Sequence, residues 1–185
     1  MTTTVTPTLA PAGTWTVDPA HSKVGFAVKH MGIATVRGEF SEFAGTLEIA
    51  DDLSTAKAYG TVNTASVDTN EEQRDAHLRS PDFFDAEQYP ELRFESTGIH
   101  ALDEETYRVT GDLTINGITN EITMTAEVQG VDVDPWGNER VGLEITGRLS
   151  RGDYGMKFNQ ALGSGNALVA DKVTLAIDVS AVKQA

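Results

Sequence analysis

Apolar and polar residues alternate along five stretches of the chain. The alternating apolar positions are Val24-Phe26-Val28-His30, Tyr107-Val109-Gly111-Leu113-Ile115, Ile122-Met124-Ala126-Val128, Val141-Leu143-Ile145 and Val173-Leu175-Ile177-Val179. A period of two places this set on one face of a β-strand and the intervening Lys, Glu, Thr and Asp residues on the other. The pattern predicts an antiparallel sheet, either closed into a barrel or folded into two layers.

Turn signals divide the chain into eight or more strands. Strands are expected at 14–18, 23–30, 35–40, 45–50, 57–63, 92–96, 107–115, 118–128, 140–150 and 169–182. The pair Asn116-Gly117 between two alternating runs predicts a tight hairpin, because both residues tolerate the positive φ of a type I′ turn. A long antiparallel sheet has exposed edges, and closure removes them. The predicted fold class is all-β, an eight-stranded antiparallel lipocalin-like barrel with an inserted short helical segment.

The inserted segment is the polar stretch that follows the fifth strand. Thr69-Asn-Glu-Glu72 matches a capping box, with Thr69 as the N-cap and Glu72 at the third helical position, and the helix is expected to end before Pro81. Phe83 and Phe84 follow in a turn-like context. This segment is predicted to cover one mouth of the barrel as a lid or plug.

Composition narrows the function without defining it. The 185 residues fit a single domain over 14–183, and 14 Lys and Arg against 28 Asp and Glu give a net charge of −14. This charge repels nucleic acid and anionic membrane surfaces at long range, so nucleic acid is not expected as a partner. The chain has no cysteine. Disulfides, thiolate metal sites and a cysteine nucleophile are therefore excluded.

Residues 1–13 are rich in Thr, Pro and Ala and are expected to form a flexible tail. They have neither the basic start nor the continuous apolar run of a secretory signal. No stretch approaches the roughly 18 apolar residues of a membrane-spanning helix. The predicted location is the cytoplasm, or the periplasm or outside the cell if a leader has been removed.

No motif for catalysis, metal binding or a cofactor stands out. The four histidines lack the spacing of a metal site, and Ser164, between Gly163 and Gly165, lacks the context of a nucleophile elbow. Adjacent acidic pairs are expected by chance among 28 acidic residues. The sequence predicts no catalytic residue, no metal and no cofactor, and the protein is not expected to be an enzyme.

Small residues on the apolar faces leave the state of the barrel interior open. Gly111 and Ala126 either leave room for a ligand or let neighbouring aromatic rings cross the barrel axis. His30 shares a face with Val24 and Phe26. It either contacts a ligand or is hydrogen bonded near the rim.

A series of short motifs resembles the YceI-like family of lipocalin-like polyisoprenoid-binding proteins. The likeness covers about residues 14–182 and rests on Trp15-x-Val17-Asp18-x-x-His21-Ser22, Gly38-x-Phe40-x-x-Phe43-x-Gly45, Arg74-Asp75-x-His77-Leu78, Asp82-Phe83-Phe84-Asp85, Gly111-x-Leu113-Thr114-Ile115-x-Gly117 and Arg151-x-Asp153-Tyr154-Gly155. The resemblance implies an elongated apolar channel that binds long-chain isoprenoids, quinones or fatty-acid derivatives. It favours the hollow barrel.

Twelve residues are candidates for ligand binding. The expected apolar wall and lid consist of Phe26, Val28, Phe40, Phe84, Phe94, Leu113, Met124, Leu143 and Phe158, and the expected polar mouth consists of His30, Arg74 and His77. Arg74 and His77 are three residues apart on the predicted helix and so share a face. They either meet the ligand head group or only anchor the helix to the barrel.

Two other functions remain open at this stage. One is an enzyme or haem-dependent protein that acts on such a lipid, and the other is a stress-related interaction protein with a filled barrel. A homodimer is also plausible, because a lid on an open barrel mouth can present apolar surface to a second copy.

Overall fold

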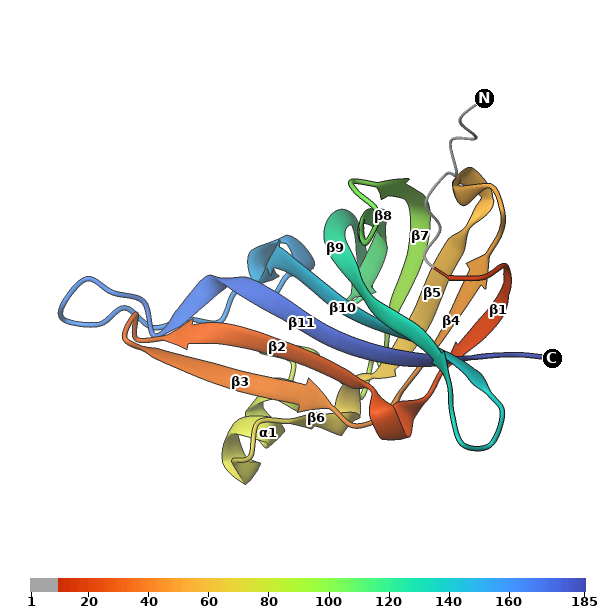
Figure 1. The fold of residues 1–185 in the computed structure, drawn as a ribbon. Coiled ribbons are helices and arrows are strands. Elements are labelled where there is room, and N and C mark those ends of the chain that lie inside the picture. The colour runs from red at the N-terminus through yellow and green to blue at the C-terminus, as the bar shows by residue number, and fades with distance from the viewer. Residues whose placement is uncertain (1–9) are drawn as a thin grey trace.

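The computed structural model describes residues 10–185, which form eleven strands and one α-helix (Figure 1). The strands are β1 Gly13–Val17, β2 Lys23–His30, β3 Ala34–Phe40, β4 Phe43–Ile49, β5 Lys57–Asn63, β6 Val67–Asp68, β7 Glu91–Ala101, β8 Thr106–Ile115, β9 Ile118–Val133, β10 Glu139–Ser150 and β11 Val169–Lys183. The helix α1 is Glu72–Arg79, and short 3-10 helices span Pro19–His21, Leu53–Thr55, Thr64–Ser66 and Arg151–Tyr154.

Eight strands close into a barrel, as the sequence predicts. Around the barrel the order is β1, β4, β5, β7, β8, β9, β10 and β11, and β11 pairs back onto β1. The closing register places Trp15 opposite Lys183 and Val17 opposite Ala181. Every pair is antiparallel, so the sheet has no free edge at this end of the molecule. We call it the closed end.

Three long strands are each interrupted, and one part of each, namely β2, β3 or β6, leaves the closed ring. β1 is separated from β2 by Pro19–His21, β3 from β4 by residues 41–42, and β5 from β6 by Thr64–Ser66. Beyond these breaks, β2 pairs with the N-terminal half of β11, β3 pairs with β2, and β6 pairs with the end of β3. In Figure 1 these strands extend away from the barrel as a long ribbon.

The helix α1 and the residues around it lie between β6 and β7, which do not pair directly. The predicted capping box is wrong. Glu71 is the N-cap, and its carboxylate accepts hydrogen bonds from the backbone N–H groups of Gln73 and Arg74 at 3.2 and 2.6 Å. Asn70 has a φ of 64°, which no helical residue adopts, so the helix cannot extend back to Thr69. The helix ends before Pro81, as expected.

The predicted hairpin between β8 and β9 is confirmed. Asn116 and Gly117 have φ values of 56° and 74°, and Ile115 pairs with Ile118 across the turn. The positive φ at both central residues is what a type I′ turn requires.

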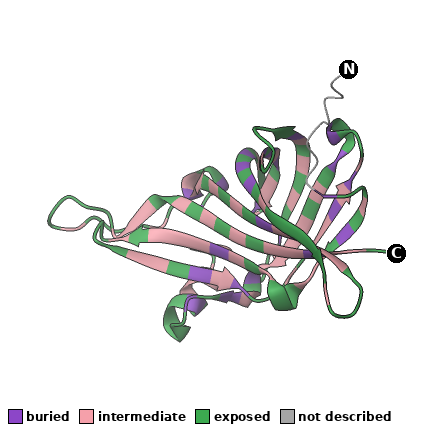
Figure 2. Cartoon of the chain, viewed as in Figure 1, coloured by how far each residue is buried: buried purple, intermediate pink, exposed green. Residues whose placement is uncertain are grey.

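Buried apolar residues form two clusters, one at each end of the barrel. The closed-end cluster centres on Trp15, Tyr107 and Ala181, all of which are fully buried, and the second cluster includes Phe40 and Phe83. Between them, half-buried and exposed residues alternate along the strands (Figure 2). The inward-facing residues Val24, Phe26 and Val28 of β2 and Val173 to Val179 of β11 are only half-buried, which indicates that they border empty space.

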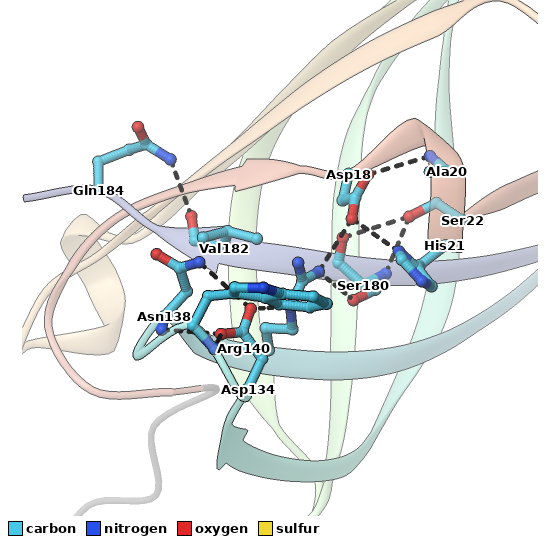
Figure 3. Close-up of polar contacts among 11 residues, drawn as sticks. Asp18, Ala20, His21, Ser22, Asp134, Asn138, Arg140, Ser180, Val182 and Gln184 are labelled. Carbon is cyan, nitrogen blue, oxygen red and sulfur yellow. Dashed lines mark hydrogen bonds and ion pairs between the residues drawn. The ribbon is translucent and has the colours of Figure 1, made fainter.

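An ionic network fastens the closed end from outside (Figure 3). Arg140 donates from Nε to Asp134 Oδ2 at 2.7 Å and from Nη1 to Asp18 Oδ2 at 2.9 Å. Hydrogen bonds from His21 and Arg140 lower the pKa of Asp18 to about 2. Burial raises the pKa of Asp134, but hydrogen bonds from Arg140 and Asn138 outweigh it and lower that pKa to about 2. The network therefore joins residues 18–21 to residues 134–140, two segments that are distant in sequence.

Most of the tail expected over residues 1–13 lies outside the described residues. Ala10 is buried in the closed-end cluster, and the Pro11 carbonyl accepts a hydrogen bond from Trp15 Nε1 at 3.0 Å. Within residues 10–185, no helix has the length and apolar character needed to cross a membrane.

Candidate ligand channel

Two cavities lie end to end inside the molecule. The inner chamber, within the closed barrel, has a volume of about 220 Å³, and the outer chamber, beneath β2 and β3, has about 300 Å³. Both are lined by Phe26, Phe40, Leu92, Ile115, Leu149 and Leu175. These shared residues form a neck at which the two chambers adjoin, and we call the two chambers together the channel.

The inner chamber presents an almost wholly apolar surface. Leu47, Ile99, Val109, Ala126 and Leu143 belong both to its wall and to the closed-end cluster, so the packed core forms its floor. Four of the predicted ligand-binding residues line this chamber alone. They are Phe94, Leu113, Met124 and Leu143.

Aromatic rings lean over the inward-facing glycines without closing the chamber. A Cβ on Gly38 would lie 2.4 Å from Phe26 Cζ, and a Cβ on Gly111 would lie 2.6 Å from Phe94 Cζ. The small residues therefore let the rings lie flat along the wall. Of the two alternatives raised by the sequence, the structure shows the one in which room remains, because the rings cover the glycines and a cavity is still present.

The outer chamber is enclosed by β2, β3, α1 and the segment that follows β10. Six further predicted residues line this chamber alone: Val28, His30, Arg74, His77, Phe84 and Phe158. Phe26 and Phe40 line both chambers, so all twelve predicted residues lie on the wall of the channel. Whether they bind a ligand stays a prediction.

Aromatic contacts connect the inserted segment to the barrel. The His77 ring packs edge-on against Phe83 and Phe158, with ring centroids 5.0 and 4.7 Å apart. The Phe84 ring meets Phe40 edge-on at 5.6 Å. The inserted segment thus covers the outer chamber, as a lid would.

The polar groups expected at the mouth also hold the helix in place. Arg74 donates from Nε to Thr69 Oγ1 and from Nη2 to the Thr69 carbonyl, both at 2.7 Å. The Asp75 carboxylate accepts from the Thr69 N–H at 2.8 Å, and His77 Nε2 lies 2.9 Å from an Asp82 carboxylate oxygen. Arg74 and His77 therefore anchor the helix and line the chamber at once.

Arg151 also lines the outer chamber, although it is not among the twelve residues predicted from the sequence. Its side chain is buried, and its guanidinium donates to the carbonyl oxygens of Met156 at 2.7 Å, Ala170 at 2.9 Å and Val169 at 3.2 Å. Burial lowers the pKa of Arg151, and the charge of Asp171 opposes this effect. A guanidinium has five N–H donors, so two remain beyond these three bonds.

The ionisable side chains that line the outer chamber are all basic. They are Lys29, His30, Arg74, His77 and Arg151. This set contrasts with the net charge of −14 on the whole chain. The outer chamber is therefore suited to a group that carries oxygen acceptors or negative charge. Across residues 10–185, no cluster of three or more His, Asp or Glu side chains has the arrangement of a metal site.

Comparison with known proteins shows which chains this protein is similar to. Residues 15–181 match the family model of the YceI-like domain. A UPF0312 protein of Staphylococcus aureus (strain N315) is 38% identical over 161 residues, which cover 86% of this chain and 91% of that protein. The solved YceI protein of Campylobacter jejuni is 29% identical, with a TM-score of 0.71 over 85% of this chain and 90% of its own.

A more distant solved structure shares the fold. A polyisoprenoid binding domain from Saccharophagus degradans, implicated in plant cell wall breakdown, superposes with a TM-score of 0.71 at 14% identity. The superposition covers 92% of this chain and 98% of that domain. At this identity the likeness concerns the fold alone.

Proposed function

Because the chain belongs to the YceI-like domain family, we propose that it binds a long-chain isoprenoid or related amphiphilic lipid inside its barrel. The candidate ligands are polyprenyl compounds, quinones and fatty-acid derivatives. The protein acts as a carrier, reservoir or sequestering protein and performs no chemistry on the lipid. The polyisoprenoid binding domain of Saccharophagus degradans, which shares this fold, supports the choice of ligand class.

The channel itself is the observation that carries this proposal. The closed-end cluster forms its floor, the inner chamber is almost wholly apolar although Arg93 and Asp178 are among its lining residues, and five basic residues line the outer chamber. An amphiphile likewise has an apolar tail at one end and a polar or charged head group at the other. The hydrocarbon tail therefore lies in the inner chamber, and the head group lies in the outer chamber.

Burial of the tail supplies the affinity. Each CH₂ moved from water into an apolar site contributes about 0.8 kcal/mol, so ten buried carbons contribute about 8 kcal/mol before ordering costs. A binding free energy of about 8 kcal/mol corresponds to roughly micromolar affinity. Selectivity then depends on the length of the channel and on the head group.

The head group meets donors that are already held in place. Arg151 is fixed by three carbonyl oxygens and Arg74 by Thr69, so neither side chain loses much conformational freedom when a ligand binds. The oxygen atoms of a quinone, a carboxylate or a phosphate accept hydrogen bonds from such groups.

The first experiment is native mass spectrometry of the purified protein, followed by organic extraction and identification of the extract. The expected result is a discrete added mass that extracts as a prenyl quinone, polyprenol or fatty-acid derivative. A clean apo mass that persists after incubation with these lipids contradicts the proposal and favours an interaction protein. A visible absorption spectrum tests the haem-dependent alternative on the same sample.

A further inference from the structure

The end of the molecule opposite the closed end is formed by two segments that are distant in sequence. We call residues 29–37 and 157–169 the distal tip. Met31 donates its N–H to the Leu168 carbonyl at 2.9 Å, and Asn166 Nδ2 donates to the Met31 carbonyl at 3.3 Å. His30 pairs with Val169. In Figure 1 these residues form the extremity of the long β2–β3–β11 ribbon.

The distal tip has no acidic residue, although the chain contains 28. No Asp or Glu occurs between Asp18 and Glu39 or between Asp153 and Asp171. The exposed charged side chains of the tip are Lys29, Arg37 and Lys157. An even spread of the 28 acidic residues over 185 would place about three in the 22 residues of the tip. The charge of this end therefore differs in sign from that of the whole chain.

Large apolar side chains are exposed at the same place. Ile33 is 79% exposed and Met31 is 36% exposed, and both lie in the turn that joins β2 to β3. Met31 has a φ of 57°, a conformation that an Asn would adopt more easily than a Met. Neither local backbone preference nor core packing accounts for these two apolar residues. Contact with an apolar partner would account for both.

The outer chamber reaches this surface. Exposed Lys29 and half-buried His30, Leu168 and Val169 are part of both the distal tip and the chamber wall. A lipid that leaves the outer chamber beside these residues emerges next to Ile33. Whatever contacts the distal tip is therefore in a position to give lipid to the channel or to receive lipid from it.

We infer that the distal tip docks on a phospholipid bilayer, with Met31 and Ile33 inserted between head groups and Lys29, Arg37 and Lys157 near the lipid phosphates. This inference rests on the proposed lipid-binding function. The net negative charge repels an anionic surface, but salt at physiological strength screens charges beyond roughly 8 Å, so the tip interacts through its own basic residues.

A second exposed apolar residue provides a matched control. Trp136 is also 79% exposed, but it lies in the β9–β10 turn beside Asp132 and Asp134, near the closed end. If exposure of one large apolar side chain were sufficient, both ends would bind lipid equally. The inference requires that only the end without acidic residues does so.

The test is co-sedimentation of the full chain with vesicles of phosphatidylcholine alone and of phosphatidylcholine mixed with phosphatidylglycerol. Ile33→Asp is expected to weaken binding to both kinds of vesicle at least about tenfold. The variant loses the apolar side chain that inserts into the bilayer and gains a negative charge. Lys29→Glu is expected to weaken binding to the mixed vesicles by about fivefold or more and to spare pure phosphatidylcholine. Trp136→Asp is expected to bind like the wild type.

Uptake of a monomeric fluorescent fatty acid without vesicles separates this inference from the proposed function. Ile33→Asp is expected to keep that uptake, since Ile33 does not line the channel. Equal loss of vesicle binding in Ile33→Asp and Trp136→Asp would overturn the inference, as would no loss in either. A wild-type dimer that Ile33→Asp converts to a monomer, with vesicle binding unchanged, would identify the tip as a contact between copies instead.

Discussion

The two ends of the barrel use the same alternating sequence pattern for opposite purposes. At the closed end, Trp15, Tyr107 and Ala181 are fully buried and pack into a solid core. In the outer half, Phe26 and Val28 alternate in the same way but are only half-buried, because they border a cavity. Alternation therefore predicts which face points inward, but it does not predict whether the interior is filled.

The pairing of the strands explains the difference. At the closed end β1 pairs with both β4 and β11, so facing walls are held close enough for side chains to meet. Beyond Pro19–His21 the ring is not completed by strand pairing, and α1 and its neighbouring loops cover the gap. The outer chamber lies in this part of the molecule, with side chains of α1 and the loops along its wall.

The charges differ between the ends as well. Asp18 and Asp134 fasten the closed end through Arg140, whereas basic side chains line the outer chamber. Stability and binding are thus expected to respond to substitutions at different ends, and this separation can be tested.

The largest effect is expected from Trp15→Ala. Removal of this fully buried indole leaves a cavity in the closed-end core and is expected to cost about 3–5 kcal/mol of unfolding free energy. Trp136→Ala, at a side chain that is 79% exposed, is expected to change it by no more than about 0.5 kcal/mol. Urea denaturation measures both. Similar losses in the two variants would show that the closed end is not the stabilising core.

The reverse result is expected for a substitution in the channel. Ile177→Trp places a large ring in the inner chamber and is expected to weaken binding of a long-chain lipid at least about tenfold, because the tail loses apolar contact there. Its urea midpoint is expected to stay close to that of the wild type. The control is Ala176→Trp, one residue away on the exposed face of β11. Retained binding by Ile177→Trp in a fluorescence titration would rule out the inner chamber as the tail site.

Arg140→Met tests the ionic network through the pH dependence of stability. The pKa values of Asp18 and Asp134 are lowered to about 2 in the folded protein, so their contribution is complete above the unfolded value of about 4. It is lost as the pH falls from about 4 to about 2. The stability difference between wild type and Arg140→Met is expected to be constant at neutral pH and to shrink over this range. Urea titrations at several pH values measure it, and a difference independent of pH down to 2 would contradict the prediction.

The smallest effect is expected at the centre of the closed end. The Tyr107 hydroxyl is buried without a hydrogen-bond partner among the described residues, and burial raises its pKa. Tyr107→Phe removes an unsatisfied polar group and is expected to raise the unfolding free energy by about 1 kcal/mol. Lipid binding is expected to be unchanged, since Tyr107 does not line the channel. A destabilised variant would show that the hydroxyl has a partner after all.

Local sequence signals predicted the strands and the helix better than they predicted where these elements begin and what caps them. The Asn116-Gly117 turn and the pairing of β11 onto β1 follow from local turn chemistry and from the need to close the sheet. The capping box at Thr69 matched its motif, yet Thr69 instead accepts from Arg74 and bonds to Asp75. Arg74 donates to this hydroxyl and Asp75 accepts from it, five and six positions away, and a four-residue motif does not include these partners.

The site residues divide in the same way. His30 and Met124 could be placed on the channel wall because strand alternation fixes which side chains point inward. Arg151 was missed because its role depends on carbonyl groups of Met156, Val169 and Ala170 that folding brings to it. The cytoplasmic location and the homodimer stay predictions from the sequence.

The sequence by itself determined the barrel, the inward face of each strand and the likeness to a family, because these depend on local periodicity and on short motifs. The tertiary structure decided that the barrel is packed at one end and hollow at the other. It also gathered five basic side chains from separate segments around the outer chamber. The physical reason is that the volume between facing walls, and the charge around it, depend on distances between residues far apart in the chain.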